Sequence, residues 1–195
     1  MSEAWQPRDA THGVIVPGRY GRGGEPGVRV LRRAGLRLAT IIAGKGRREE
    51  AARALQELAG TAPPAAPKAA HGIMSLVWSG PDQWLMVGDR ADAVEAAARK
   101  LAGLAAVSDQ SDARAVVRLS GARIRDVLAK GCPIDLHPRV FKTGDAALTA
   151  IAHIGVQLWQ IDDQPAYDIT VPRSMVSSFW SWFDASAAEF GYAVE

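Results

Sequence analysis

The segment from Val107 to Gly144 constrains the fold of this chain most, because it joins a strand pattern, a helix pattern and the only cysteine. Side chains alternate over residues 113–119 with the period of a half-buried strand. Residues 121–130 then place apolar side chains at helical spacing on one face, after Ser120, which can cap the helix. Gly131 is expected in the left-handed conformation that often ends a helix. The segment therefore predicts a strand followed directly by a short helix.

Cys132 follows this predicted helix, and its reactivity depends on that position. The C-terminal end of a helix carries the negative pole of the helix dipole, which disfavours a thiolate. Free cysteine is also among the most buried residue types. We therefore expect a small buried thiol. An activated thiol stays open as an alternative, since Lys130 and His137 are near in sequence.

The same alternation of short strands and helices runs along the rest of the chain. Strands are predicted at residues 28–31, 36–43, 73–78, 83–88, 104–107, 147–153, 156–161 and 166–171, and helices at 46–59, after Asp89 and after Pro172. Hairpins outnumber the crossovers that a parallel sheet needs. The predicted fold class is therefore α+β, as one domain over residues 28–195, made of two sheet-and-helix halves at about 28–107 and 108–195.

Residues 1–27 differ from the rest, because they are rich in glycine, proline and arginine and poor in apolar side chains. Such a segment cannot bury enough apolar surface to fold alone. We expect a flexible N-terminal arm, which either stays disordered or becomes ordered by lying on a partner. Its arginines leave a local phosphate or nucleic-acid contact as a further alternative.

Composition excludes several classes of protein. The chain has 23 basic and 21 acidic residues, so its formal charge of +2 gives no global attraction to nucleic acid. One cysteine excludes an internal disulfide. No apolar run is long enough for a membrane span, and residues 1–26 contain no apolar stretch typical of a signal peptide. We expect a cytoplasmic protein that binds neither nucleic acid nor membrane.

The sequence carries no recognisable catalytic, cofactor-binding or metal motif. No glycine-rich turn of the dinucleotide-binding kind follows a predicted strand, and no phosphate-binding loop is present. The four histidines stand alone, without the spacing that places two of them on one helical face. Carboxylates such as Asp109 and Asp168 could bind a pterin ring, but most of the acidic residues fit turns equally well. The predicted catalytic, cofactor and metal residues are therefore none.

Aromatic residues crowd the last predicted helix. Phe179, Trp180, Trp182 and Phe183 cannot all face one core, because successive helical positions point about 100 degrees apart. We predict that Trp180 projects away from the apolar stripe. It is then either a lone exposed aromatic residue or an anchor in the pocket of a partner, where tryptophan is enriched.

Several short motifs in the second half occur together and in a fixed order. They are Val107–Asp112, Leu119–Gly121, Lys130–Pro138, Ile151–Gly155, Trp159 and Ser178–Trp180. In this respect the chain resembles the gamma subunit of heterotetrameric sarcosine oxidases, a family that includes the related subunit of N-methylglutamate dehydrogenase complexes. The resemblance is strong from Val107 to Gly191 and covers the first hundred residues only in outline.

The resemblance implies the fold of the folate-binding region of aminomethyltransferases. It also implies a non-catalytic subunit with a structural or assembly role. Its complex would oxidise sarcosine to glycine and pass the one-carbon unit to tetrahydrofolate. The partners would be the alpha, beta and delta subunits, chiefly the large alpha subunit. FAD, FMN, NAD, zinc and tetrahydrofolate would be held by those other subunits, and this chain would bind no cofactor.

Six residues are candidates for the subunit interface under this interpretation: Trp180, Tyr20, Arg19, Cys132, His137 and Arg139. Two other functions stay open. One is a folate-binding one-carbon transferase or regulator that acts alone, and the other is the equivalent subunit of an N-methylglutamate dehydrogenase. The sequence does not identify the amine, because its pocket would lie on another chain.

Overall fold

The structure, a computed structural model, describes residues 9–195 as two β-sheets with helices on their outer faces. The strands are β1 (Gly18–Tyr20), β2 (Val28–Arg32), β3 (Arg37–Ala43), β4 (Ala69–His71), β5 (Ser75–Gly80), β6 (Gln83–Gly88), β7 (Ala105–Asp109), β8 (Arg114–Ser120), β9 (Ala146–Ile151), β10 (Ile154–Asp162), β11 (Ala166–Pro172) and β12 (Tyr192–Val194). The helices are α1 (Arg48–Ala59), α2 (Ala93–Lys100), α3 (Ile124–Ala129), α4 (Val176–Ala187) and the short 3₁₀ helices η1 (Arg173–Met175) and η2 (Ala188–Phe190).

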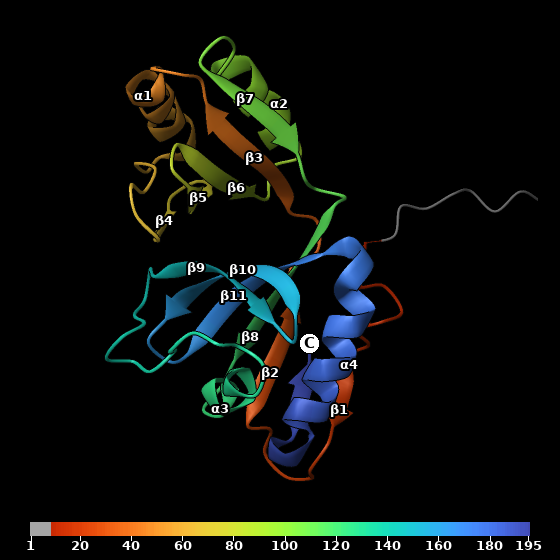
Figure 1. Cartoon of the computed structure of the whole chain (residues 1–195). Coiled ribbons are helices and arrows are strands. Elements are labelled where there is room, and N and C mark those ends of the chain that lie inside the picture. The colour runs from red at the N-terminus through yellow and green to blue at the C-terminus, as the bar shows by residue number, and fades with distance from the viewer. Residues whose placement is uncertain (1–8) are drawn as a thin grey trace, which may run out of the picture.

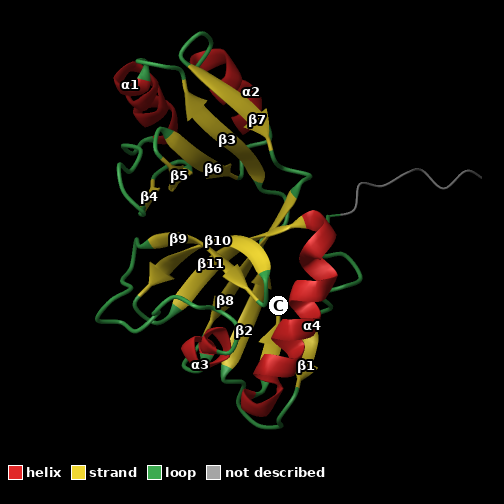
Figure 2. Ribbon diagram, in the orientation of Figure 1, coloured by secondary structure: helices red, strands yellow, loops and turns green. Residues whose placement is uncertain are grey.

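The layers run helix, sheet, sheet, helix (Figure 1). The larger sheet has seven strands in the order β1-β12-β2-β8-β11-β10-β9, and the smaller has five in the order β4-β5-β6-β3-β7. Neighbouring strands are antiparallel except β12 and β2, which are parallel. Figure 2 shows α1 and α2 on the outer side of the smaller sheet, and α3 and α4 beside the larger sheet. The α+β prediction is confirmed.

The seven-stranded sheet buries one face against α3 and α4. Phe179, Phe183 and Ala187 lie four residues apart on α4, so they form one stripe, and all three are fully buried. The stripe packs on strand residues that alternate inward, such as Tyr167 and Ile169 of β11. This cluster is the largest apolar core of the protein.

The five-stranded sheet buries its outer face in the same way. Ala51 and Leu55 of α1 and Ala97 of α2 pack on Ile41 of β3 and Trp84 of β6. The indole N–H of Trp84 donates to the carbonyl oxygen of Pro64 at 2.8 Å, which ties the proline-rich loop after α1 to this core.

The inner faces of the two sheets meet in a smaller apolar cluster. The five-stranded sheet contributes Leu38, Val77, Leu85 and Val87, and the seven-stranded sheet contributes Val116, Ala146 and Trp159. Each of these residues alternates along its strand with residues that face the helices, as the two-residue period of a strand requires. Both faces of each sheet are therefore at least partly covered.

The strands missed by the sequence analysis are the short ones. β1, β4 and β12 have three residues each, too few for an alternating pattern to stand out.

The boundary between the predicted halves also needs correction. β2 was placed with the first half, but it pairs with β8 and β12 of the seven-stranded sheet. Long-range strand pairing decided this, and no local pattern reports it.

The ends of α3 also differ from the prediction. Ser120 is the last residue of β8, and the residue before the helix is Arg123, whose side chain makes no capping bond. Gly131 is not left-handed. A Cβ atom at this position would lie 2.7 Å from the indole ring of Trp182, so glycine allows the end of α3 to approach α4 closely.

The predicted N-terminal arm is partly built into the fold. Ile15 is fully buried in the core beneath α4, and β1 pairs with β12. Residues 15–20 are thus held by the core and by β12, whereas residues 1–8 of the arm lie outside the described residues. Within residues 9–195, none of the helices has the length and apolar character needed to cross a membrane.

Candidate functional site

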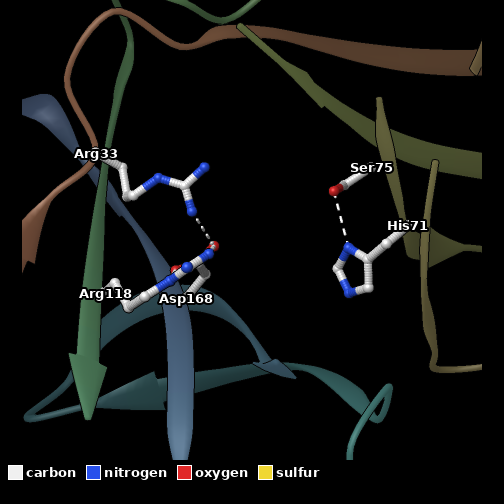
Figure 3. A network of polar contacts seen from close by, with 5 residues as sticks. All are labelled: Arg33, His71, Ser75, Arg118 and Asp168. Carbon is white, nitrogen blue, oxygen red and sulfur yellow. Dashed lines mark hydrogen bonds and ion pairs between the residues drawn. The ribbon is translucent and has the colours of Figure 1, made fainter. Parts of the chain in front are cut away.

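Three charged residues meet between the two sheets (Figure 3). Asp168 of β11 accepts hydrogen bonds from Nε and Nη2 of Arg118 on β8, at 2.7 and 2.8 Å. Arg33, which follows β2, donates Nη1 to the same carboxylate at 3.1 Å. Asp168 and Arg118 are directly opposed in the β8–β11 register, so the strand pairing itself brings them together. Only 6% of the Asp168 side chain is exposed.

The electrostatics of this cluster are those of a structural pair. Hydrogen bonding to Asp168 raises the pKa of Arg118, although burial opposes this effect. The two-point contact fixes the guanidinium plane against the carboxylate, which gives orientation as well as energy. Because two guanidinium groups share one carboxylate, the cluster carries excess positive charge. It holds β2, β8 and β11 in register on the face that meets the smaller sheet.

His71 of β4 lies across from this cluster on the smaller sheet (Figure 3). Its Nδ1 atom is 2.9 Å from the hydroxyl oxygen of Ser75 on β5. Burial lowers the pKa of His71, while the negative charge of Asp168 acts in the opposite direction. The imidazole is therefore mostly neutral at pH 7, since the ordinary pKa of histidine is already below 7.

Polar bonds also join the sheets at a second point. Gln157 of β10, which is 1% exposed, donates Nε2 to the carbonyl oxygen of Trp78 at 2.9 Å and to the hydroxyl of Ser79 at 3.1 Å. Lys68 and Asp145 form an ion pair close by, on an isolated backbone bridge between the two sheets. Specific polar contacts therefore set how the sheets lie on each other.

Trp180 occupies a different place from the predicted one. Its ring stacks on Phe183 with centroids 5.1 Å apart and meets Tyr192 edge-on at 5.8 Å. Tyr20 stacks on the other side of this group, against Tyr192 at 5.1 Å. β12 and the N-terminal residues cover this side of α4, so Trp180 is partly buried and does not project away from the core. Sequence periodicity could not show that β12 and the N-terminal residues lie over this side of α4.

The structure brings three of the six candidate residues together. Trp180 and Tyr20 share Tyr192 as a neighbour, and Arg19 precedes Tyr20 on β1. Arg19 is exposed, Tyr20 is 36% exposed, and the adjacent Val16 is 48% exposed. Residues 16–20 therefore present an apolar and basic edge beside α4, which we call the arm edge.

The other three candidates lie in the loop after α3. Cys132 is buried, 7% exposed, and burial raises the pKa of its thiol, so its side chain cannot face a partner. His137 and Arg139 are exposed, and Val140 beside them is 59% exposed. We call residues 137–140 the loop tip. Val140 was not among the predicted interface residues, although an apolar residue in a polar loop is a visible signal.

Within residues 9–195, no three histidine, cysteine or acidic side chains gather closely enough to hold a metal ion.

The cluster of Asp168 with Arg33 and Arg118 was not predicted from the sequence. Its signal is a charged residue inside an otherwise apolar strand, which occurs in both β8 and β11 and indicates a buried partner.

Comparisons with known proteins agree with this architecture. The model of the sarcosine oxidase gamma subunit family matches residues 47–189. A sarcosine oxidase subunit gamma from Corynebacterium sp. strain P-1 is 36% identical over 121 residues, which is 60% of this chain and 58% of that protein. Another from Corynebacterium sp. strain U-96 is 33% identical over 147 residues, 72% of this chain and 70% of that protein. The chain thus matches little more than half the length of the strain P-1 relative.

Two solved structures show the same fold. A chain of the heterotetrameric sarcosine oxidase from Corynebacterium sp. U-96 matches with a TM-score of 0.83 at 26% identity, over 94% of this chain and 96% of that chain. The glycine cleavage system aminomethyltransferase T from Bartonella henselae matches with a TM-score of 0.59 at 11% identity, over 87% of this chain and 47% of that chain. The second match concerns the fold alone and agrees with the predicted aminomethyltransferase-like architecture. The chain therefore belongs to the sarcosine oxidase gamma subunit family.

Proposed function

We propose that this chain is the gamma subunit of a heterotetrameric sarcosine oxidase. The observation that carries the proposal is the match to a chain of such an oxidase over 94% of this chain, through both sheets and their helices. The complex would oxidise sarcosine to glycine and transfer the one-carbon unit to tetrahydrofolate. Its FAD, FMN, NAD, zinc and tetrahydrofolate would be held by the alpha, beta and delta subunits.

The role we propose for this chain within the complex is structural. Three groups that could take part in chemistry are engaged within the fold. Asp168 is held by two arginines, the thiol of Cys132 is buried with a raised pKa, and His71 bonds to Ser75. Side chains committed in this way position strands and sheets, which is what a subunit that shapes an assembly requires.

The surfaces proposed to contact partners, chiefly the alpha subunit, are the loop tip and the arm edge. Val140 is more than half exposed, and Arg139 and His137 flank it. The arm edge places Val16 and Tyr20 beside Arg19. An apolar side chain bordered by arginine and aromatic residues matches the composition of interface cores.

The test is assembly with the other subunits. The full chain carrying Val140→Asp is expressed together with its alpha, beta and delta subunits, and its recovery in the purified complex is measured. A charge at a buried interface position lacks a partner, so recovery should fall strongly. Ile73→Asp is the matched control, because Ile73 is 65% exposed in the turn between β4 and β5 of the smaller sheet. Val16→Asp tests the arm edge in the same way.

Two results would contradict the proposal. One is full recovery of every variant in a complex that is otherwise intact, which removes both surfaces from the interface. The other is turnover of sarcosine, or micromolar fluorescence quenching by tetrahydrofolate, with the isolated chain. Quenching would favour the folate-binding alternative, and turnover would place a catalytic group on this chain.

A further inference from the structure

A cavity of about 330 Å³ lies where the two segments that join the sheets pass each other. Residues 33–36 lead from β2 to β3, and residues 110–113 lead from β7 to β8. The charged residues that line the cavity are Asp9, Arg33, Arg37, Asp112, Arg114 and Arg173. Four arginines thus face two aspartates, and positive charge predominates.

Arg114 is the residue that points to a ligand. It is partly buried, and within residues 9–195 nothing donates to, accepts from or pairs with its side chain. Burial lowers the pKa of Arg114, and no neighbouring carboxylate counteracts it. Partial burial of a guanidinium group without a counter-ion carries a free-energy cost, and a bound anion would compensate for that cost.

Neither aspartate of the cavity neutralises Arg114. Asp9 accepts hydrogen bonds from the backbone N–H and the hydroxyl of Thr11, so its carboxylate is engaged within its own turn. Asp112 is exposed at the rim. Arg37 also lines the cavity and is exposed, and its charge lowers the pKa of Asp109. Two guanidinium groups, those of Arg114 and Arg37, are therefore available to one ligand.

The walls of the cavity are held by bonds between the two connecting segments. Leu38 donates its backbone N–H to the hydroxyl of Ser111 at 3.1 Å, and Gln110 donates its N–H to the carbonyl oxygen of Leu38 at 2.8 Å. Arg173 donates its backbone N–H to the carbonyl oxygen of Ala113 at 2.8 Å. The guanidinium groups are thus carried on a fixed frame, which reduces the entropy lost on binding.

We propose that this cavity binds a small oxyanion, a carboxylate or a phosphate group, through Arg114 together with Arg37. Arginine forms paired hydrogen bonds to both kinds of anion. The volume is at the lower end of small-molecule sites, which suits a small organic acid or a phosphate monoester. The hydroxyl of Ser111 completes the polar lining. The proposal does not depend on the assembly proposed above.

The test is isothermal titration calorimetry on the full chain with inorganic phosphate, succinate and uncharged succinamide. Phosphate or succinate should bind saturably and succinamide should not, and the tighter of the two anions identifies the source of the oxyanion. Arg114→Gln should weaken binding by about tenfold or more, the loss expected for a hydrogen bond to a charged group. Arg53→Gln, on the exposed side of α1, removes one charge elsewhere and should leave affinity within about twofold.

Thermal unfolding shows whether each variant is folded, and Arg37→Gln serves as the second variant if Arg114→Gln is not. Absence of saturable anion binding to the folded wild-type chain would overturn the proposal, as would equal affinity in the arginine variants. If the wild-type chain binds neither anion but Arg114→Gln loses the partner subunits, the cavity is a protein contact and the small-anion site is wrong.

Discussion

The two faces of the seven-stranded sheet are built by different rules. The face beneath α3 and α4 is apolar, and Tyr167 of β11 is fully buried there with Phe179 and Phe183 of α4. The face toward the smaller sheet mixes a small apolar cluster with a buried carboxylate, Asp168, and a buried amide, Gln157. Apolar burial is non-directional, whereas hydrogen bonds fix direction. The helix face therefore supplies most of the stability, and the inter-sheet face sets the orientation of the second layer.

The largest effect should come from the helix face. Phe183→Ala removes a fully buried ring that contacts Trp180 and Tyr192, and the remaining cavity cannot collapse between a helix and a sheet. We expect a loss of about 3–5 kcal/mol in the free energy of unfolding, measured by urea denaturation. A loss below about 1 kcal/mol would break the comparison, since the helix face would then not dominate stability.

A smaller effect is expected from the inter-sheet face. Asp168→Ala leaves Arg33 and Arg118 without their shared acceptor, each about one-third exposed, so water compensates in part. We expect a loss of about 2 kcal/mol. Asp126→Ala breaks an exposed ion pair with Arg123 and serves as the control, with an expected loss below about 1 kcal/mol. Equal losses in the two variants would mean that burial of Asp168 adds nothing.

Close packing at the end of α3 can be tested with one methyl group. Gly131→Ala would place its Cβ atom 2.7 Å from the ring of Trp182, so helix and ring must move apart. We expect a loss of about 1–2 kcal/mol in thermal or urea unfolding. Gly155→Ala is the control, because nothing lies within 4 Å of its added Cβ atom. A neutral Gly131→Ala would show that the interface between α3 and α4 is loose.

The smallest effect concerns pH. Burial lowers the pKa of His71 in the folded state, so as pH falls below about 6.5 the unfolded state binds a proton first. Stability is therefore fully present above that pH and is lost as pH falls toward the folded pKa. His71→Asn removes this dependence, so unfolding curves at pH 7 and pH 5 should differ less than in the wild type. If stability at pH 7 and pH 5 differs as much in His71→Asn as in the wild type, protonation of His71 does not contribute to the pH dependence of stability.

Local patterns predicted most of the fold because most elements follow local rules. The helices and the strands of five or more residues appear where residue periodicity places them, since apolar side chains must line one face of each element. The placement of β2 beside β12 and β8 could not be predicted, because the paired residues are far apart in the sequence and such pairing leaves no local trace. β12 was missed for a different reason, because its three residues are too few to show an alternating pattern.

The candidate sites were less accessible to sequence reasoning. Trp180 was predicted to project away from the apolar stripe, but it packs against Phe183 and Tyr192, and the contact with Tyr192 depends on a distant strand. The ion pairs of Asp168 join residues up to 135 positions apart, and a single carboxylate in a strand does not name its partners. Identifying the partners of a charged residue in a strand requires the register of the sheet, and the register is known only from the whole fold.

The position of β12 between β1 and β2 has a consequence for biosynthesis. The backbone N–H of Glu195 donates to the carbonyl oxygen of Val30 at 2.9 Å, so the segment around β12 is bonded to a strand that is synthesised more than 150 residues earlier. The seven-stranded sheet can close only after β12 has left the ribosome. Until then one edge of β2 is unpaired. An unpaired strand edge in a nascent chain must be kept from pairing with other chains.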